Sequence, residues 1–121
     1  MYLADSNIII YSYQEQYKYL RTLILEEYVY FSEISRIEVL GYHLINLDEE
    51  EYFKELFKLV PIIVPSKPIF DKAIEIRKVY NLELGDSLIA ATALVNDLVV
   101  YTRNTKHFGR VDKLKIIDPI R

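Results

Sequence analysis

The stretch Leu84–Asn104, LGDSLIAATALVNDLVVYTRN, joins a helix-forming segment to a strand-forming one. In its first half apolar side chains recur three and four residues apart, which predicts a helix from residue 84 or 85 to about residue 96. Its second half contains a continuous apolar run at 98–101, typical of a buried strand. Six polar side chains follow in a row at 102–107. The predicted strand therefore ends either in an ordinary turn or at the rim of a site.

The same alternation of strands and helices extends over the whole chain. Further strands are predicted at 2–4, 28–31, 61–65 and 114–117, and further helices at 14–26, 32–46, 48–60 (capped by Asp48) and 67–80. This order predicts the α/β class, with a parallel sheet of four or five strands and helices on both of its faces. The chain has 121 residues and no visible linker or repeat, so we expect a single domain over 1–121.

The composition excludes several classes of protein. The chain has no cysteine, which rules out disulfide scaffolds, thiolate metal sites and thiol nucleophiles and agrees with a reducing compartment. The first residues, MYLADSN, lack a basic start, and no apolar run approaches the ~20 residues of a membrane span. We therefore expect a cytoplasmic protein without a leader or a membrane partner.

The charge is unevenly distributed along the chain. The net charge of −3 argues against a protein that is basic as a whole. Residues 102–121, however, are rich in cations: Arg103, Lys106, Arg110, Lys113, Lys115 and Arg121, against Asp112 and Asp118. Such a strip is either a solvated surface or a surface that binds a phosphate backbone.

Three acidic residues stand out by position. Asp5 directly follows the first predicted strand, Glu38 lies beside Ile37 at the edge of a helix face that we expect to be buried, and Asp86 lies in the first turn of the helix 84–96. Each alone could be a helix cap or an exposed acid. Ligands bind at the carboxyl ends of parallel strands, so we expect these carboxylates to converge there. Converging carboxylates stay ionised around a hard cation such as Mg²⁺ or Mn²⁺, which suits phosphodiester hydrolysis beside a basic strip.

Other chemistries find no support in the sequence. There is no glycine-rich phosphate loop and no GxSxG nucleophile motif. His43, within GYHLI, is expected to be a packed or half-exposed helix residue. For His107 two interpretations stay open, because it could pack at the base of its loop beside Phe108 or reach a metal or a phosphate.

Four segments together resemble the PIN-domain nucleases. They are MYLADSNIIIYSY, FSEISRIEVLGY, LGDSLIAATAL and LVVYTRNTKHF, and they occur in the order and spacing of that family over the whole chain. The residues of the second and fourth segments are most similar to those of the VapC toxins of bacterial and archaeal toxin–antitoxin pairs. This resemblance implies a metal-dependent endoribonuclease that uses Mg²⁺ or Mn²⁺ and is the toxin of such a pair. The implied partners are an RNA substrate, a small cognate antitoxin and a second copy of the chain.

The resemblance also implies roles for individual residues. The catalytic metal ligands would be Asp5, Glu38 and Asp86, with Asn7 orienting Asp5, Thr102 and Asn104 at the metal rim, and Arg103 and Lys106 contacting RNA phosphates. Many members carry a fourth carboxylate at the place of Asn104 or His107, and this chain has none there. A second, tightly held metal is therefore not expected from these motifs.

Two alternatives and one further expectation remain. The missing fourth acid favours, as the main alternative, a catalytically degenerate PIN-like module that binds RNA or protein. A receiver-type phosphoacceptor fits poorly, because Asp5 has no acidic neighbour and Lys67 comes too early in the chain. We also expect a homodimer, because clustered tyrosines supply more apolar surface than a small domain readily hides. These tyrosines are Tyr11, Tyr13, Tyr17 and Tyr19.

Overall fold

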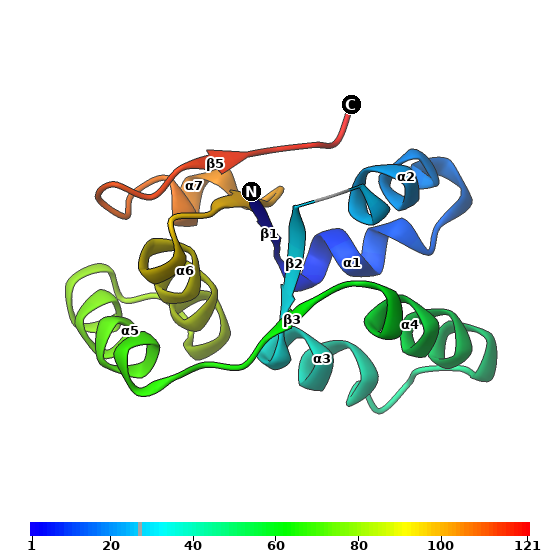
Figure 1. The fold of residues 1–121 in the computed structure, drawn as a ribbon, viewed down its shortest axis with the longest axis horizontal. Helices are drawn as coiled ribbons and strands as arrows, with labels where there is room; N and C mark the ends of the chain where they lie inside the picture. The colour runs from blue at the N-terminus through cyan, green and yellow to red at the C-terminus, as the bar shows by residue number, and fades with distance from the viewer. Residues whose placement is uncertain (27) are drawn as a thin grey trace.

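The computed structural model of the protein describes residues 1–26 and 28–121 and contains one five-stranded sheet (Figure 1). The strands are β1 (Tyr2–Ala4), β2 (Val29–Ser32), β3 (Ile62–Ile63), β4 (Val99–Tyr101) and β5 (Ile116–Ile117). Their order across the sheet is β3-β2-β1-β4-β5, and every neighbouring pair is parallel. The predicted parallel α/β sheet is therefore confirmed, and it has five strands.

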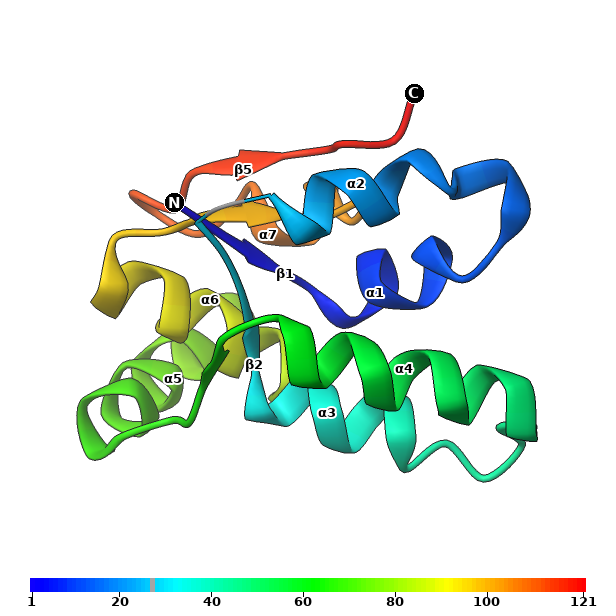
Figure 2. The same cartoon turned by 45° about the vertical axis from the view of Figure 1, so that its right-hand side comes forward.

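Helices cover both faces of this sheet, as predicted. They are α1 (Ser6–Ser12), α2 (Tyr19–Leu25), α3 (Glu33–Leu40), α4 (Leu47–Leu59), α5 (Lys67–Tyr80), α6 (Leu84–Asn96) and α7 (Thr105–Phe108), with a 3-10 turn η1 at Glu15–Tyr17. Figures 1 and 2 show α5 and α6 on one side of the sheet and α1, α2 and α4 on the other. Among the described helices, none is both long and apolar enough to cross a bilayer.

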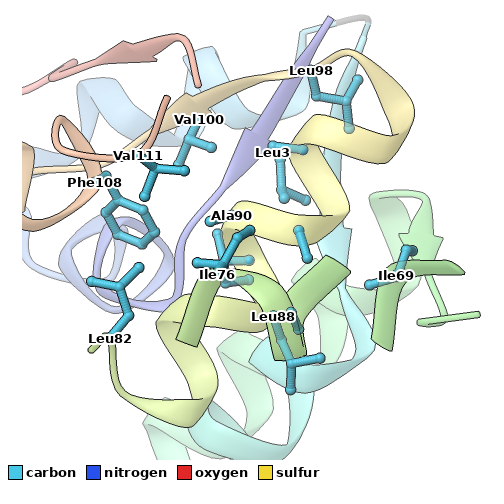
Figure 3. Close-up of a cluster of buried hydrophobic side chains, with 14 residues drawn as sticks. Leu3, Ile69, Ile76, Leu82, Leu88, Ala90, Leu98, Val100, Phe108 and Val111 are labelled. Atoms are coloured by element: carbon cyan, nitrogen blue, oxygen red, sulfur yellow. The ribbon is translucent and has the colours of Figure 1, made fainter. Parts of the chain in front are cut away.

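The sheet separates two apolar cores. On one side Leu3 of β1 and Val100 of β4 pack with α5, α6 and Phe108 of α7 (Figure 3). On the other side Ala4 and Phe31 pack with α1, α2 and α4. Successive strand residues point to opposite faces. Because both faces are buried, the strands are continuous apolar runs in the sequence rather than alternating ones.

The helix predicted at 32–46 is shorter than expected. It ends at Leu40, and Gly41 is its C-cap. Its buried face includes Val39, whereas Ile37, which we expected to be buried, is 63% exposed. Apolar spacing alone does not mark this end. Glycine is a weak helix former, and the chain must reverse here so that α4 can pack against α3.

The next helix begins at a different cap from the predicted one. Asn46, not Asp48, caps α4, and it forms a capping box with Glu49 in which each side chain accepts the other residue's backbone N–H. His43, expected on a helix, lies instead in the exposed loop before this cap, with its ring against Tyr42. Local hydrogen bonding therefore outweighed the apolar periodicity that extended through residues 42–46.

The single helix predicted at 14–26 is also wrong. The chain forms η1 and then α2, and α1 precedes them over residues 6–12. Arg21 of α2 donates to the carbonyls of Ser12 and Tyr13, each at 2.7 Å. These carbonyls lie at the end of α1, where a helix leaves acceptors without intrahelical partners. The arginine thereby ties α2 back onto α1.

Candidate active site

Asp5 is fixed at the carboxyl end of β1 by bonds to two other elements. Its Oδ1 accepts the backbone N–H of Ile8 at 3.1 Å and so caps α1. Its Oδ2 accepts the hydroxyl of Thr102 at 2.5 Å, and Thr102 directly follows the neighbouring strand β4. The side chain is 5% exposed. A buried carboxylate with bonds to both oxygens cannot easily change its orientation.

Thr102 contacts Asp5 from the end of β4 and is not among the residues that line the pocket around Asp5. It is fully buried, and its hydroxyl oxygen also accepts the backbone N–H of Asn104 at 2.9 Å. One hydroxyl therefore positions Asp5 and shapes the turn that leads into α7.

A pocket of about 290 Å³ opens at the carboxyl edge of the sheet. Five of the eight residues to which the resemblance gave a role line it: Asp5, Asn7, Glu38, Asp86 and Asn104. The other lining residues are Ser6, Glu83, Ile89 and His107. The sheet topology thus brings together side chains from α1, α3, the start of α6 and the turn before α7. Arg103 and Lys106 are exposed and lie outside this lining.

Glu38 reaches the pocket from an exposed position near the end of α3. Its Oε1 accepts the hydroxyl of Ser6 at 2.7 Å. On its other side is Gly85, where a Cβ atom would lie only 2.9 Å from Glu38 Oε2. The missing side chain at Gly85 therefore lets the Glu38 carboxylate approach the first turn of α6, directly beside Asp86.

The pocket concentrates negative charge. Burial raises the pKa of the Asp86 carboxyl above its ordinary value, and the charges of Asp5, Glu83 and Glu38 raise it further. Burial also raises the pKa of Asp5, although the Thr102 hydroxyl and backbone N–H groups oppose this shift. Both shifts favour the neutral acid. A cation in this pocket would relieve the repulsion and favour the ionised forms.

Glu83 is a pocket carboxylate that the sequence interpretation missed. It occupies the N-cap position of α6, three residues before Asp86, and makes no side-chain cap bond there. A spacing of three places two helix residues on one face, and this was the available signal. Glu83 gives the pocket a fourth carboxylate from a different place than Asn104 or His107.

His107 also lines the pocket. Its Nδ1 lies 3.0 Å from the Asn104 side-chain nitrogen, and the residue is exposed, whereas its neighbour Phe108 is fully buried. The interpretation of His107 as a packed residue is therefore wrong. The imidazole and the amide form one polar wall of the pocket.

The donor chemistry of the pocket fits a hard divalent cation, since its charged groups are carboxylates. As placed, no three Asp, Glu or His side chains among residues 1–26 and 28–121 lie close enough together to hold one ion. Asp5 is held by its hydrogen bonds, and Glu38 bonds to Ser6. Glu38 is the exposed and extended member, so rotation of its side chain is the simplest way to gather the ligands.

We expect Thr102→Val to destabilise the protein by about 1–3 kcal/mol at neutral pH, because it removes the hydroxyl that donates to Oδ2 of the buried Asp5 carboxylate. Asp5 has a raised pKa in the folded protein. Above that pKa the carboxyl is charged and opposes folding. Below that pKa the carboxyl is neutral and does not oppose folding. The loss in the variant should therefore shrink as the pH falls through the pKa of Asp5. Urea unfolding at several pH values measures this.

Thr92→Val is the matched control. Thr92 is also fully buried, but its hydroxyl donates to the Leu88 carbonyl, which does not titrate in this range. Its effect on unfolding should be independent of pH. If the two variants showed the same pH dependence, the Thr102 hydroxyl would not be acting through Asp5.

A parallel α/β protein with an acidic pocket at the carboxyl edge of its sheet is the class that fold and site define. Residues 2–114 match the model of the family described as PIN domain. The chain therefore belongs to the PIN-domain family, as its four sequence segments predicted.

One known protein that is similar to part of this chain is named a ribonuclease. The Ribonuclease VapC of Rickettsia bellii (strain RML369-C) is 35% identical over 69 residues, which are 55% of this chain and 52% of that protein. The match thus spans about half the length of this curated relative.

Solved structures match over nearly the full length. A toxin–antitoxin complex from Klebsiella pneumoniae has 27% identity and a TM-score of 0.78 and covers 100% of this chain and 99% of its own. FitAcB from Neisseria gonorrhoeae has 28% identity and a TM-score of 0.80, with 98% of each chain covered. VapBC-1 from nontypeable Haemophilus influenzae has 25% identity and a TM-score of 0.78 and covers 97% and 96%.

Proposed function

We propose that this chain is a VapC-like endoribonuclease, the toxin of a toxin–antitoxin pair, and that it hydrolyses RNA phosphodiester bonds with Mg²⁺ or Mn²⁺. The observation that carries the proposal is the pocket that gathers Asp5, Glu38 and Asp86 at the carboxyl edge of a PIN-domain sheet. The name of the Rickettsia relative supports the ribonuclease activity.

Within this proposal Asp5, Glu38 and Asp86 hold the divalent ion, and Glu83 adds negative charge beside them. When bound, such an ion polarises the scissile phosphate and lowers the pKa of a water molecule, the chemistry needed for phosphodiester hydrolysis. Thr102 and the N-terminus of α1 orient Asp5 through their hydrogen bonds, which also oppose the rise of its pKa by burial.

The polar groups around the carboxylates would position the RNA. Asn7, for which the proposed role is to orient Asp5, is in the first turn of α1 next to it, and Asn104 lies with His107 on another wall of the pocket. Arg103 and Lys106 are exposed in the segment after β4, on either side of Asn104 along the chain. Their cationic groups would contact phosphates on either side of the scissile bond.

The proposed protein partners are a cognate antitoxin and a second copy of the chain. The similar solved structure from Klebsiella pneumoniae is a toxin–antitoxin complex, which supports an antitoxin partner.

For the proposed dimer, the four tyrosines that motivated the prediction are only partly exposed. The large exposed apolar side chains on other helices include Ile37 on α3, Phe70 and Ile74 on α5, and Leu84 on α6. A monomeric mass by light scattering at tens of micromolar would contradict a dimer. A cytoplasmic location, where RNA and antitoxin meet, completes the proposal.

The direct test of the activity is incubation of the purified chain with a set of unstructured RNAs in Mn²⁺, in Mg²⁺ or in EDTA. We expect discrete RNA fragments with either metal and none in EDTA. Fragments that persist in EDTA would contradict a metal-dependent site.

A catalytically degenerate binding module is the second candidate. The observation that favours it is that the described carboxylates do not already converge on one point. This candidate predicts that the purified chain binds RNA or protein without cutting RNA under any metal condition. Absence of cleavage, together with absence of Mn²⁺ binding at millimolar metal, would favour it over the nuclease.

Gly85→Ala provides a test of Glu38 as a ligand. The new methyl group would lie 2.9 Å from Glu38 Oε2, so the flexible carboxylate must turn away. We expect weaker Mn²⁺ binding, by about 10-fold, while the unfolding free energy stays the same or rises by up to ~1 kcal/mol, because alanine favours a helix more than glycine does. Calorimetric titration and urea unfolding measure the two effects.

Leu84→Ala, at the exposed neighbouring position, is the control and should bind Mn²⁺ like the parent. Unchanged Mn²⁺ affinity in Gly85→Ala would remove Glu38 from the ligand set.

A further inference from the structure

Three tyrosines and two arginines form a continuous strip on the surface beside the pocket. We call Arg103, Tyr11, Tyr17, Tyr19 and Arg121 the Arg–Tyr strip. We propose that this strip binds the single-stranded RNA segment next to the scissile phosphate, with the arginines contacting phosphates and the exposed tyrosine surface stacking on a base. This inference rests on the proposed ribonuclease function and adds to it the path of the substrate.

Contacts between distant parts of the chain hold the strip together at its first end. Arg103 follows β4, yet its guanidinium carbon lies 5.4 Å from the centre of the Tyr11 ring on α1. One of its terminal nitrogens donates to the Tyr17 hydroxyl at 3.4 Å. Tyr11 and Tyr17 pack edge to face, with ring centres 5.1 Å apart. Arg103 is therefore exposed but pre-positioned, which reduces the entropy lost when it binds a ligand.

The other end of the strip is built in the same way. Tyr17 and Tyr19 have ring centres 6.4 Å apart. Arg121 places its guanidinium carbon 4.7 Å from the centre of the Tyr19 ring, and its backbone N–H donates to the Tyr19 hydroxyl at 3.0 Å. Figures 1 and 2 show the C-terminal segment ending beside α2, the helix that begins with Tyr19. The strip thus links four segments that are separated in the sequence.

The strip begins one helical turn from the pocket. Asn7 lines the pocket, and Tyr11 lies four residues later on α1, which places both on the same face of that helix. Arg103 stands between Thr102, which holds Asp5, and Asn104, which lines the pocket. A nucleic acid strand with a phosphate in the pocket therefore has the strip as its adjoining surface.

Charge favours RNA as the occupant of this surface. In the part of the chain that the structure describes, no carboxylate forms a salt bridge with Arg103 or Arg121. The neighbouring pocket is acidic and would repel a polyanion, so RNA needs uncompensated cations close by. Cations interleaved with aromatic rings are typical of surfaces that bind single strands without reading their sequence. The tyrosines of the strip are half-buried, so each ring is anchored in the protein and still reaches solvent.

The test is equilibrium binding of an unstructured, 5′-fluorescent RNA 12-mer in EDTA, followed by anisotropy, which separates binding from cleavage. We expect the double variant Arg103→Ala/Arg121→Ala to bind RNA about 10-fold or more weakly. The slope of log affinity against log salt concentration should fall by the amount that corresponds to about two phosphate contacts. Tyr17→Leu should weaken binding by about 5-fold or more without changing the salt dependence. Tyr17→Phe keeps the ring and loses only the hydroxyl that bonds Arg103, so it should bind RNA more tightly than Tyr17→Leu. Circular dichroism and melting curves confirm that each variant is folded.

The control pair is Lys58→Ala/Lys78→Ala, which removes two exposed cations from α4 and α5. If the strip pair bound RNA as tightly as this control pair, the inference would be overturned, and the strip would serve a different partner. The proposed function is tested separately, by metal-dependent cleavage of RNA. If the parent chain cleaves RNA but the strip variants bind RNA unchanged, only the inference about the strip is overturned. If RNA binds through the strip but the parent chain never cleaves it, only the proposed nuclease activity is overturned.

Discussion

The Asp86→Asn variant should lose RNA cleavage by about 100-fold or more, because it removes one anionic ligand of the proposed metal while keeping the shape of the side chain. Asp86 is the best position for this test. Asp5 also caps α1 and bonds Thr102, so a change there affects the fold as well as the site. Cleavage rates of a defined RNA in Mn²⁺ measure the effect.

The same variant should be more stable than the parent in EDTA, by ~2–4 °C in melting temperature. Burial and neighbouring carboxylates raise the pKa of Asp86. Its ionised form therefore opposes folding at neutral pH, and the gain should vanish as the pH falls below the ordinary aspartate range, where the parent carboxyl is protonated. Asp97→Asn, at the exposed far end of α6, is the control and should cut RNA like the parent. Cleavage at the parental rate by Asp86→Asn would mean that the site is wrongly assigned.

The Phe108→Ala variant should lower the unfolding free energy by about 3–5 kcal/mol, the usual loss for a fully buried phenylalanine. Phe108 is 0% exposed and packs in the core cluster that includes Leu3, Val100 and Val111 (Figure 3). It is the buried residue of α7, a four-residue helix too short to be stable alone. Its loss should therefore release the turn that carries Asn104 and His107 to the pocket.

Urea unfolding measures this loss of stability. Lys106→Ala is the control, because Lys106 is the exposed neighbour on the same short helix. It should change the unfolding free energy by less than ~0.5 kcal/mol. A loss below ~1 kcal/mol in Phe108→Ala would show that α7 is not held by this side chain.

Elements with local end signals could be predicted from the sequence. The predicted helices 67–80 and 84–96 match α5 and α6. Pro68 marks the first turn of α5, and Asn81 ends it in a left-handed conformation that asparagine tolerates. Asp5 could be placed as well, because it follows a strand and parallel strands align their carboxyl ends at one edge. Asp86 begins the helix that leads back to the start of the parallel strand β4, so it could be assigned to the same edge without a structure.

Features that depend on tertiary contacts could not be predicted. α7 has no periodicity of its own and is held by the insertion of Phe108 into the core. Glu83 has the spacing to share a face with Asp86, but that α3 meets α6 there, where Gly85 leaves room for Glu38, is known only from the structure. From the sequence, the tyrosines at 11, 13, 17 and 19 are expected to form an exposed apolar surface. Their rings are instead half-covered by one another and by arginines such as Arg103, which is distant in sequence.

The central claim is that the acidic pocket holds a divalent cation. Titration of the purified chain with Mn²⁺, with free Mn²⁺ followed by electron paramagnetic resonance, tests it most directly, because it needs neither a substrate nor a partner. We predict saturable binding of Mn²⁺ by the parent chain and by Asp97→Asn, and binding weakened by about 10-fold or more in Asp86→Asn. Equal Mn²⁺ affinity in the parent and in Asp86→Asn would contradict the account.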